Sequence, residues 1–223
     1  MKVIYFDNNA TTRVADEVFE AMRPYFCELY GNPSSMHTFG GQVGVRIREA
    51  REHVAALLGC HPSEVIFTSC GTESDSTAIL GTLAAVPHRR KVITTRVEHP
   101  AVLTVCRDLE NRGYQVIELG VDKQGRLDLG ELESHLDDDT AIVTIMSANN
   151  ETGTVFPIEK IARMVTDRGI TFHTDAVQVV GKISQPGGQA SLRQQERESI
   201  CQHGNLDPAR FEVALPVKAA DWF

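Results

Sequence analysis

Hydrophobic residues are spaced as in amphipathic helices over the N-terminal part of the chain. Between residues 41 and 58, apolar side chains recur every three or four positions, and Gly59 follows as a residue that commonly ends a helix. The same spacing runs from Val14 to Leu29, but Pro24 should kink or end that helix. The sequence therefore predicts a long helix over residues 41–58 and an interrupted one before it.

Farther along, apolar runs rich in β-branched residues alternate with segments of helical spacing. The runs are "VIFTS", "KVITTRV", "YQVIELGV", "AIVTIMS" and "ITFHT". The helical segments between them are "STAILGTLAAV", "AVLTVCRDLENRG", "LGELESHL" and "IEKIARMVTDRG". Strands joined by helices of this length form crossovers, so the pattern predicts an α/β fold: a mostly parallel sheet with flanking helices on both faces.

The sequence changes character after residue 183. Residues 184–223 contain Pro and Gly near their start and continue as a polar run of mixed charge without a clear period. We therefore expect two parts, residues 1–183 and a divergent tail of residues 184–223. The alternation of Phe211, Val213, Leu215 and Val217 could add one strand, and Pro216 would be tolerated there only at a sheet edge.

Composition and charge narrow the class of protein. With 42% hydrophobic and 23% charged residues, the chain has the composition of a soluble globular protein. A net charge of -8 and a pI near 5.5 disfavour nucleic acid and anionic membrane as partners, because both attract clustered Lys and Arg. No segment resembles a signal peptide or the run of about 18 apolar residues that spans a membrane. We expect a cytoplasmic protein.

The cysteines point to free thiols. There are five, an odd number, widely spaced and without a Cys-x-x-Cys pair: Cys27, Cys60, Cys70, Cys106 and Cys201. This pattern favours reduced thiols over a disulfide framework, and it contains no zinc site. We expect no structural metal.

Four polar clusters follow directly on predicted strands. They are "SCGTESDS" (69–76), "VEHP" (97–100), "SANNETG" (147–153) and "HTDAVQ" (173–178). In open α/β sheets, ligands bind outside the carboxyl ends of the strands. We therefore expect the four clusters to meet at one edge of the sheet and to form one binding site.

Three of the clusters also have ordinary structural explanations. Gly71 and Thr72 precede a helix whose free amides could hold a phosphate, but a capped turn would look the same. His99 stands before Pro100 and could be a helix cap or a surface residue. Asn150 lies in a segment that could simply be a turn. Each of these alternatives stays open from the sequence alone.

The fourth cluster is harder to explain as an ordinary turn, because the carboxylate of Asp175 lies at the end of an apolar strand. Burying an unpaired carboxylate costs several kcal/mol, so Asp175 needs a cationic partner, and an arginine is one alternative. Gln178 lies on the other side of the strand exit. Pyridoxal phosphate (PLP) would satisfy all four clusters, since it carries a phosphate, a flat ring, a phenolic oxygen and a pyridine nitrogen that an aspartate keeps protonated.

Six linked motifs resemble those of a known family. They are "YFDNNATT", "GNPSSMH", "FTSCGTESDS", "VEHPAV", "ANNETGT" and "HTDAVQVVGK", in this order over about residues 1–183. Together they resemble the cysteine desulfurases of the class V aminotransferases, and most closely the nitrogen-fixation type. The resemblance implies the large domain of a fold-type I PLP-dependent transferase, here incomplete.

The resemblance also implies roles for six residues. Gly71 and Thr72 would bind the cofactor phosphate, His99 would stack on the ring and act as an acid or base, Asn150 and Gln178 would lie at the phenolic oxygen, and Asp175 would pair with the ring nitrogen. The family reaction converts L-cysteine to L-alanine and leaves a persulfide on an enzyme cysteine. That sulfur then passes to an iron–sulfur scaffold protein, and the family works as a homodimer.

Two catalytic groups of the family are not found in this sequence. The family continues to a Ser-x-His-Lys segment whose lysine anchors the cofactor, and to a loop cysteine that takes up sulfur; neither motif occurs here. Lys182 is better explained as a solvated lysine, and Lys218 and Cys201 lie in no matching context. We therefore expect a truncated family member that does not turn over alone. A frameshift, a truncation or an erroneous gene model would each produce the junction near residue 184.

Two alternatives to a desulfurase stay open from the sequence. The first is a non-catalytic fragment that binds the cofactor or dimerises with a full-length paralogue. The second keeps the fold but changes the chemistry, to a selenocysteine lyase or another class V aminotransferase. The residues of the motifs "CGTESDS" and "ANNETGT" favour the desulfurase.

Overall fold

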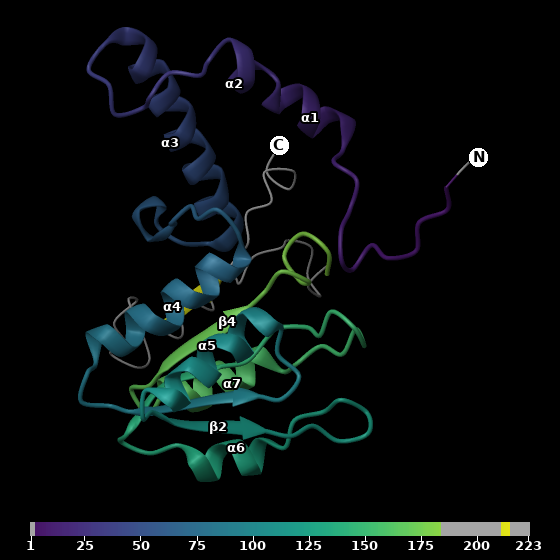
Figure 1. Cartoon of the computed structure of the whole chain (residues 1–223), viewed down its shortest axis with the longest axis vertical. Coiled ribbons are helices and arrows are strands. Elements are labelled where there is room, and N and C mark those ends of the chain that lie inside the picture. The colour runs from purple at the N-terminus through teal and green to yellow at the C-terminus, as the bar shows by residue number, and fades with distance from the viewer. Residues whose placement is uncertain (1–2, 184–210, 215–223) are drawn as a thin grey trace. The chain divides into compact units, whose positions relative to one another are not determined.

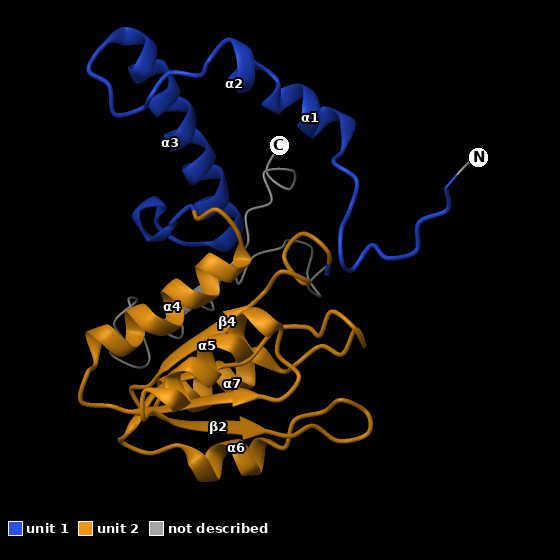
Figure 2. Cartoon of the chain, in the orientation of Figure 1, with its two compact units in different colours: residues 1–67, 183–197, 217–223 blue, residues 68–182, 198–216 orange. Residues whose placement is uncertain are grey.

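The chain is described by a computed structural model over residues 3–183 and 211–214 (Figure 1). The described residues divide into two compact units (Figure 2). The first contains residues 3–67 and residue 183, and the second contains residues 68–182 together with 211–214. The expected division at residue 184 stays a prediction, because most of the tail lies outside the described residues.

The first unit is helical. It contains α1 (Asp16–Met22), α2 (Pro24–Cys27), α3 (Thr38–Leu58) and a 3-10 turn (Pro62–Glu64). Pro24 separates α1 from α2 and occupies the first position of α2, where its missing N–H costs no hydrogen bond. The long helix α3 begins three residues before the predicted start and ends as predicted at Gly59, which has a left-handed φ of 66°.

The second unit is built on a parallel sheet. Its strands are β1 (Lys91–Thr95), β2 (Gln115–Leu119), β3 (Thr140–Thr144), β4 (Thr171–Asp175) and β5 (Phe211–Ala214). They are ordered β2-β1-β3-β4-β5, and every neighbouring pair is parallel. The predicted α/β class with a mostly parallel sheet is therefore confirmed.

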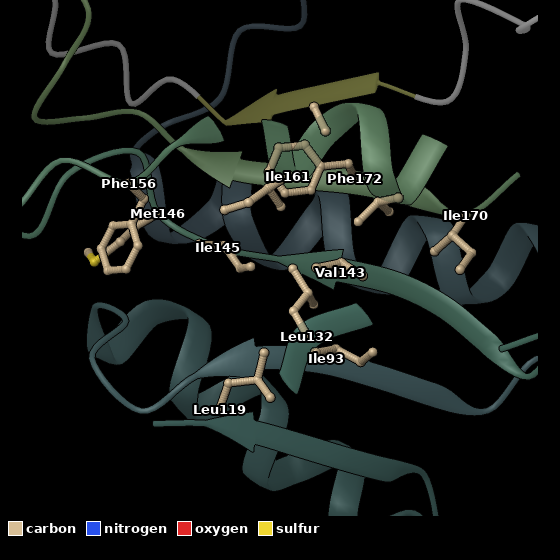
Figure 3. Packing of buried hydrophobic residues seen from close by; sticks show 12 residues of the cluster. Ile93, Leu119, Leu132, Val143, Ile145, Met146, Phe156, Ile161, Ile170 and Phe172 are labelled. Carbon is tan, nitrogen blue, oxygen red and sulfur yellow. The ribbon is translucent and has the colours of Figure 1, made fainter. Parts of the chain in front are cut away.

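Helices cover both faces of this sheet, as predicted. They are α4 (Gly71–Ala85), α5 (Pro100–Asn111), α6 (Leu129–His135) and α7 (Ile158–Thr166). Adjacent strand residues point to opposite faces. Accordingly, Val92 packs in a buried cluster with Ile79 of α4, whereas Ile93 packs in another with Leu132 of α6 and Ile161 of α7 (Figure 3).

One predicted strand is wrong. The segment "VIFTS" begins in an extended conformation, with φ -89° and ψ 123° at Val65, but it forms no strand. A strand exists only when a neighbour takes up its backbone hydrogen bonds. Among the described residues no segment pairs with it, and Ile66 remains 74% exposed.

The predicted edge strand is confirmed for the part that is described. Phe211–Ala214 pairs with β4 and lies at the end of the strand order. Leu215, Val217, Lys218 and Cys201, which entered the predictions above, lie outside the described residues. No helix in the described part of the chain is long and apolar enough to cross a membrane.

Candidate functional site

The four polar clusters meet in the second unit, as the parallel topology predicts. The cluster after β3 touches the cluster after β4, because the Ser147 amide donates to the Asp175 carbonyl at 2.8 Å and the Ser147 hydroxyl lies 2.8 Å from that of Thr174. It also touches the cluster after β1, through a 2.9 Å bond from the Asn149 side-chain amide to the Val97 carbonyl. Three strand ends therefore form one continuous polar edge.

Helix α4 brings the remaining cluster to the same edge. Asp75, in its second turn, places Oδ1 3.6 Å from Nε2 of His173 on β4. The Asp75 carboxyl also interacts electrostatically with that of Asp175. The start of α4 and the end of β4 thus belong to one site.

Asp175 is buried at the centre of this site, with 7% of its surface exposed. Its Oδ1 accepts a 3.0 Å hydrogen bond from the Val177 amide. Burial raises the pKa of the carboxyl, while the Val177 amide and the nearby His99 act in the opposite direction. Among the described residues no Lys or Arg forms an ion pair with Asp175, so the arginine alternative finds no support there.

The first turn of α4 carries Gly71 and Thr72. The residue before the helix, Cys70, makes no side-chain cap hydrogen bond to the helix amides. The Glu73 carboxylate turns back instead, accepting bonds from the amide and the hydroxyl of Ser69 at 2.6 and 2.5 Å. The capped-turn explanation in its usual form is therefore not what the structure shows. The Glu73 amide, with the Ser69 hydroxyl and the Thr72 amide, nevertheless lowers the pKa of the Cys70 thiol, so this end of the helix favours a negatively charged group.

His99 acts as a helix cap, which was one of its two explanations. Its Nδ1 accepts a 3.2 Å hydrogen bond from the Ala101 amide at the start of α5. An accepting Nδ1 means that the neutral ring carries its hydrogen on Nε2. The ring is exposed and lies near Asp175, whose pKa it lowers when the ring is protonated. The cap therefore orients the ring beside the site without burying it.

Asn150 and Gln178 lie in the loops after β3 and β4. Asn150 is half-buried and donates from its side chain to Glu151 at 2.8 Å. Its neighbour Asn149 forms the expected turn, with Oδ1 accepting from the amides of Glu151 and Thr152 at 3.0 and 2.8 Å. Gln178 accepts from Lys182 at 2.9 Å, so this lysine is an exposed partner of the loop.

Sequence reasoning did not single out Glu98. Its side chain is 5% exposed and accepts a 2.7 Å hydrogen bond from the Thr95 hydroxyl. Both of its oxygens lie 3.0 Å from the Met146 amide, so Glu98 ties the end of β1 to the end of β3. Burial raises the pKa of this carboxyl to about 8. A glutamate directly before the cap residue gave no sequence signal of burial.

Asp75 and His173 were also missed, although each had a signal. Asp75 lies on one helical stripe with the buried residues Ile79, Thr82 and Leu83, and this spacing marks an inward-facing position. His173 is two residues before Asp175 and therefore faces the same side of β4. Burial raises the pKa of Asp75 to about 8 and lowers that of His173 to about 4.

The assembled residues fit an anionic, aromatic ligand with a cationic nitrogen. Asp175 provides a buried carboxylate with which no Lys or Arg pairs among the described residues, α4 provides the amides of its first turn, and His99 provides a ring near Asp175. PLP carries a phosphate, a flat ring and a pyridine nitrogen that these groups could bind. Within the described part of the chain, no group of three or more His, Cys, Asp or Glu could hold a metal ion.

Comparisons with known proteins agree with this geometry. The family model described as aminotransferase class-V matches residues 4–186. The cysteine desulfurase of Trichormus azollae is 63% identical over 183 residues, which are 82% of this chain and 46% of that relative. The cysteine desulfurase NifS of Azotobacter vinelandii is 61% identical over 184 residues, with the same shares covered.

A solved structure shows the same likeness in three dimensions. A NifS-like protein superposes with a TM-score of 0.78 at 45% sequence identity, over 81% of this chain and 50% of that chain. The chain thus spans about half the length of the relatives that it matches.

Proposed function

Because this chain belongs to the class V aminotransferase family, we propose that its second unit binds PLP and forms part of the active site of a cysteine desulfurase of the nitrogen-fixation type. The observation that carries the proposal is the buried carboxylate of Asp175. It lies at the strand end where ligands of α/β sheets bind, and no cation pairs with it among the described residues. A protonated pyridine nitrogen would supply that cation.

The chain's own residues would each hold one part of the cofactor. The amides of Gly71 and Thr72 would bind the phosphate, because they lie in the first turn of α4, at the positive end of the helix dipole. His99 would lie against the ring, and Asn150 and Gln178 would lie toward the phenolic oxygen. Asp175 would keep the proton on the ring nitrogen. When bound, PLP supplies an electron sink for chemistry at the amino-acid substrate.

The proposed substrate is L-cysteine, and the sulfur acceptor is an enzyme thiol. The thiol takes the sulfur atom and becomes a persulfide, while the cysteine carbon skeleton, with its sulfur replaced by hydrogen, leaves as L-alanine. Atoms balance without an added oxidant or reductant. By resemblance to the family, we also propose an iron–sulfur scaffold protein as the next acceptor, a homodimer as the working assembly, and a cytoplasmic location.

Turnover needs an amine that anchors the cofactor and moves protons. The family's Ser-x-His-Lys segment does not occur in the 223-residue sequence. Lys182 is exposed and donates to the Val177 carbonyl at 3.2 Å and to Gln178 at 2.9 Å. We therefore propose that this chain binds PLP without sustained desulfurase turnover when it is alone.

The test is an absorbance titration of the purified chain with PLP, followed by borohydride reduction and mass mapping. We expect saturable binding that the Asp175→Asn substitution weakens by about 10- to 150-fold, since a charge-assisted hydrogen bond contributes roughly 1.5–3 kcal/mol. Substitution of the exposed Asp167 by Asn is the matched control and should leave binding unchanged.

Two results would contradict the proposal. Equal PLP affinity of wild type and Asp175→Asn would remove Asp175 from the site. Release of alanine and sulfide from cysteine at a sustained rate, with one lysine trapped by borohydride, would show that the chain supplies its own anchoring amine.

A further inference from the structure

Two buried polar atoms face each other between α4 and β4, and neither has a hydrogen-bond partner among the residues that the structure describes. They are Oδ1 of Asp75 and Nε2 of His173, which lie 3.6 Å apart. Asp75 is 2% exposed and His173 is 0% exposed. Buried polar atoms without a partner are rare in folded proteins, because each costs the free energy of its lost hydration. The pair therefore needs an explanation.

The other nitrogen of His173 is already engaged. Its Nδ1 lies 2.7 Å from the Thr144 hydroxyl on β3. If Nδ1 carries the ring hydrogen and donates it to Thr144, Nε2 is left with a lone pair directed at Asp75. A carboxyl group that carries a proton can donate it to this lone pair. One hydrogen on Asp75 then satisfies both unpartnered atoms after a small movement of the side chain.

The surroundings favour this neutral arrangement over an ion pair. An ion pair would require both a carboxylate and an imidazolium to be stripped of water, which costs more than burying the two neutral groups. The other titratable groups that act on Asp75 and its neighbours are Asp175, Glu98 and the exposed His99. The negative charge of Asp175 disfavours a second anion nearby, and burial shifts the pKa of Asp75 upward and that of His173 downward.

We propose that Asp75 and His173 form a neutral, hydrogen-bonded pair that positions the two ends of the ligand site relative to each other. Asp75 lies four residues, about 6 Å along the helix axis, after Gly71, where the site would hold phosphate. His173 lies two residues, about 6.6 Å, before Asp175, where it would hold the ring nitrogen. The contact therefore sets the distance between the phosphate end and the nitrogen end. This positioning role rests on the proposed PLP site, whereas the neutral pair itself does not.

The protonation state can be read without any cofactor. In the full chain labelled with nitrogen-15 histidine, ring correlation spectra distinguish imidazolium from the two neutral tautomers, and a His173→Gln variant identifies the signal. We expect His173 to be neutral at pH 7, with Nε2 unprotonated, in both wild type and Asp75→Asn. Asparagine is uncharged like the protonated carboxyl and can donate to the same nitrogen. An imidazolium signal in the wild type that becomes neutral in Asp75→Asn would overturn the neutral pair.

The positioning role is tested by PLP titration of three variants on α4. Asp75→Asn should bind PLP within about threefold of wild type, and Asp75→Leu, which cannot donate, should bind about tenfold more weakly, the factor that corresponds to ~1.4 kcal/mol. Thr82→Val, another buried polar position of α4, is the control and should leave affinity unchanged.

The outcomes separate the two proposals. If Asp75→Leu binds as tightly as wild type, the positioning role is wrong. If wild type does not bind PLP, the proposed function and the positioning role fail together, but the histidine spectra still decide the neutral pair. If Asp75→Leu does not fold, the decision rests on Asp75→Asn, where a loss of affinity beyond tenfold would contradict the role assigned to the pair.

Discussion

Replacing Glu98 by glutamine should change how the stability of this chain depends on pH. The carboxyl of Glu98 is buried between the ends of β1 and β3 and accepts hydrogen bonds from Thr95 and Met146. Glutamine has the shape of a protonated glutamate and retains one oxygen that can accept these bonds. The substitution therefore removes the titration of Glu98 while keeping most of its packing.

The size of the effect follows from the shift in pKa. Burial raises the pKa of Glu98 from an ordinary value of 4.5 to about 8. Between these two values the folded chain keeps a proton on Glu98 that the unfolded chain has lost, so the wild type loses stability as the pH rises and reaches the full loss above pH 8. Because one pKa unit corresponds to about 1.36 kcal/mol, the free energy of unfolding of Glu98→Gln relative to wild type should increase by about 3 kcal/mol from pH 5 to pH 8.

The assay is urea denaturation of both proteins followed by far-ultraviolet circular dichroism at several pH values from 5 to 8. Other buried carboxyls titrate in both proteins, so the difference between the two reports Glu98 together with its electrostatic coupling to Asp175 and Asp75. The exposed Glu110, substituted by Gln, is the control and should differ from wild type by less than about 0.5 kcal/mol at every pH. A difference between Glu98→Gln and wild type that does not change with pH would refute the reasoning, because it would mean that the folded and unfolded chains protonate Glu98 alike.

Further predictions concern the backbone and the loop after β3. Gly59→Ala should lower the free energy of unfolding by about 1 kcal/mol in urea denaturation, because Gly59 has a left-handed φ of 66°. Gly41→Ala should raise it by up to about 1 kcal/mol, because Gly41 lies within α3 and an added Cβ there meets no atom. Changes of the same sign in the two variants would contradict this reasoning. Asn149→Ala should cost about 2 kcal/mol, because it removes the bond to the Val97 carbonyl and leaves the turn amides unpaired, and it should speed amide hydrogen exchange in residues 150–154. Unchanged exchange there would show that the side chain does not hold the loop.

Much of the fold could be predicted from the sequence because its causes are local. The position of Pro24 separates α1 from α2 since proline lacks an N–H, and Gly59 ends α3 since it adopts a left-handed conformation without a steric cost. The alternation of strands and helices was sufficient to predict a parallel sheet and the meeting of four polar clusters at one edge. The position of Asp175 among them followed from the same rule.

The failures share one physical cause, which is that they depend on what packs against a residue. The segment "VIFTS" has the composition of a strand, but strand formation requires a hydrogen-bonding neighbour, and no described segment pairs with it. Glu98 follows a strand like any loop residue, and only the packing of β1 against β3 buries it and raises its pKa.

The sequence by itself determined the periodicities, the breaks and the kinds of side chain available to the site. The tertiary structure alone decided which of those side chains lose contact with water and which polar atoms then face each other. Asp75 and His173 are far apart in the chain, and their contact exists only because α4 packs on β4. Desolvation acts on atoms according to their surroundings in space, so the charge states of this site are a property of the folded chain.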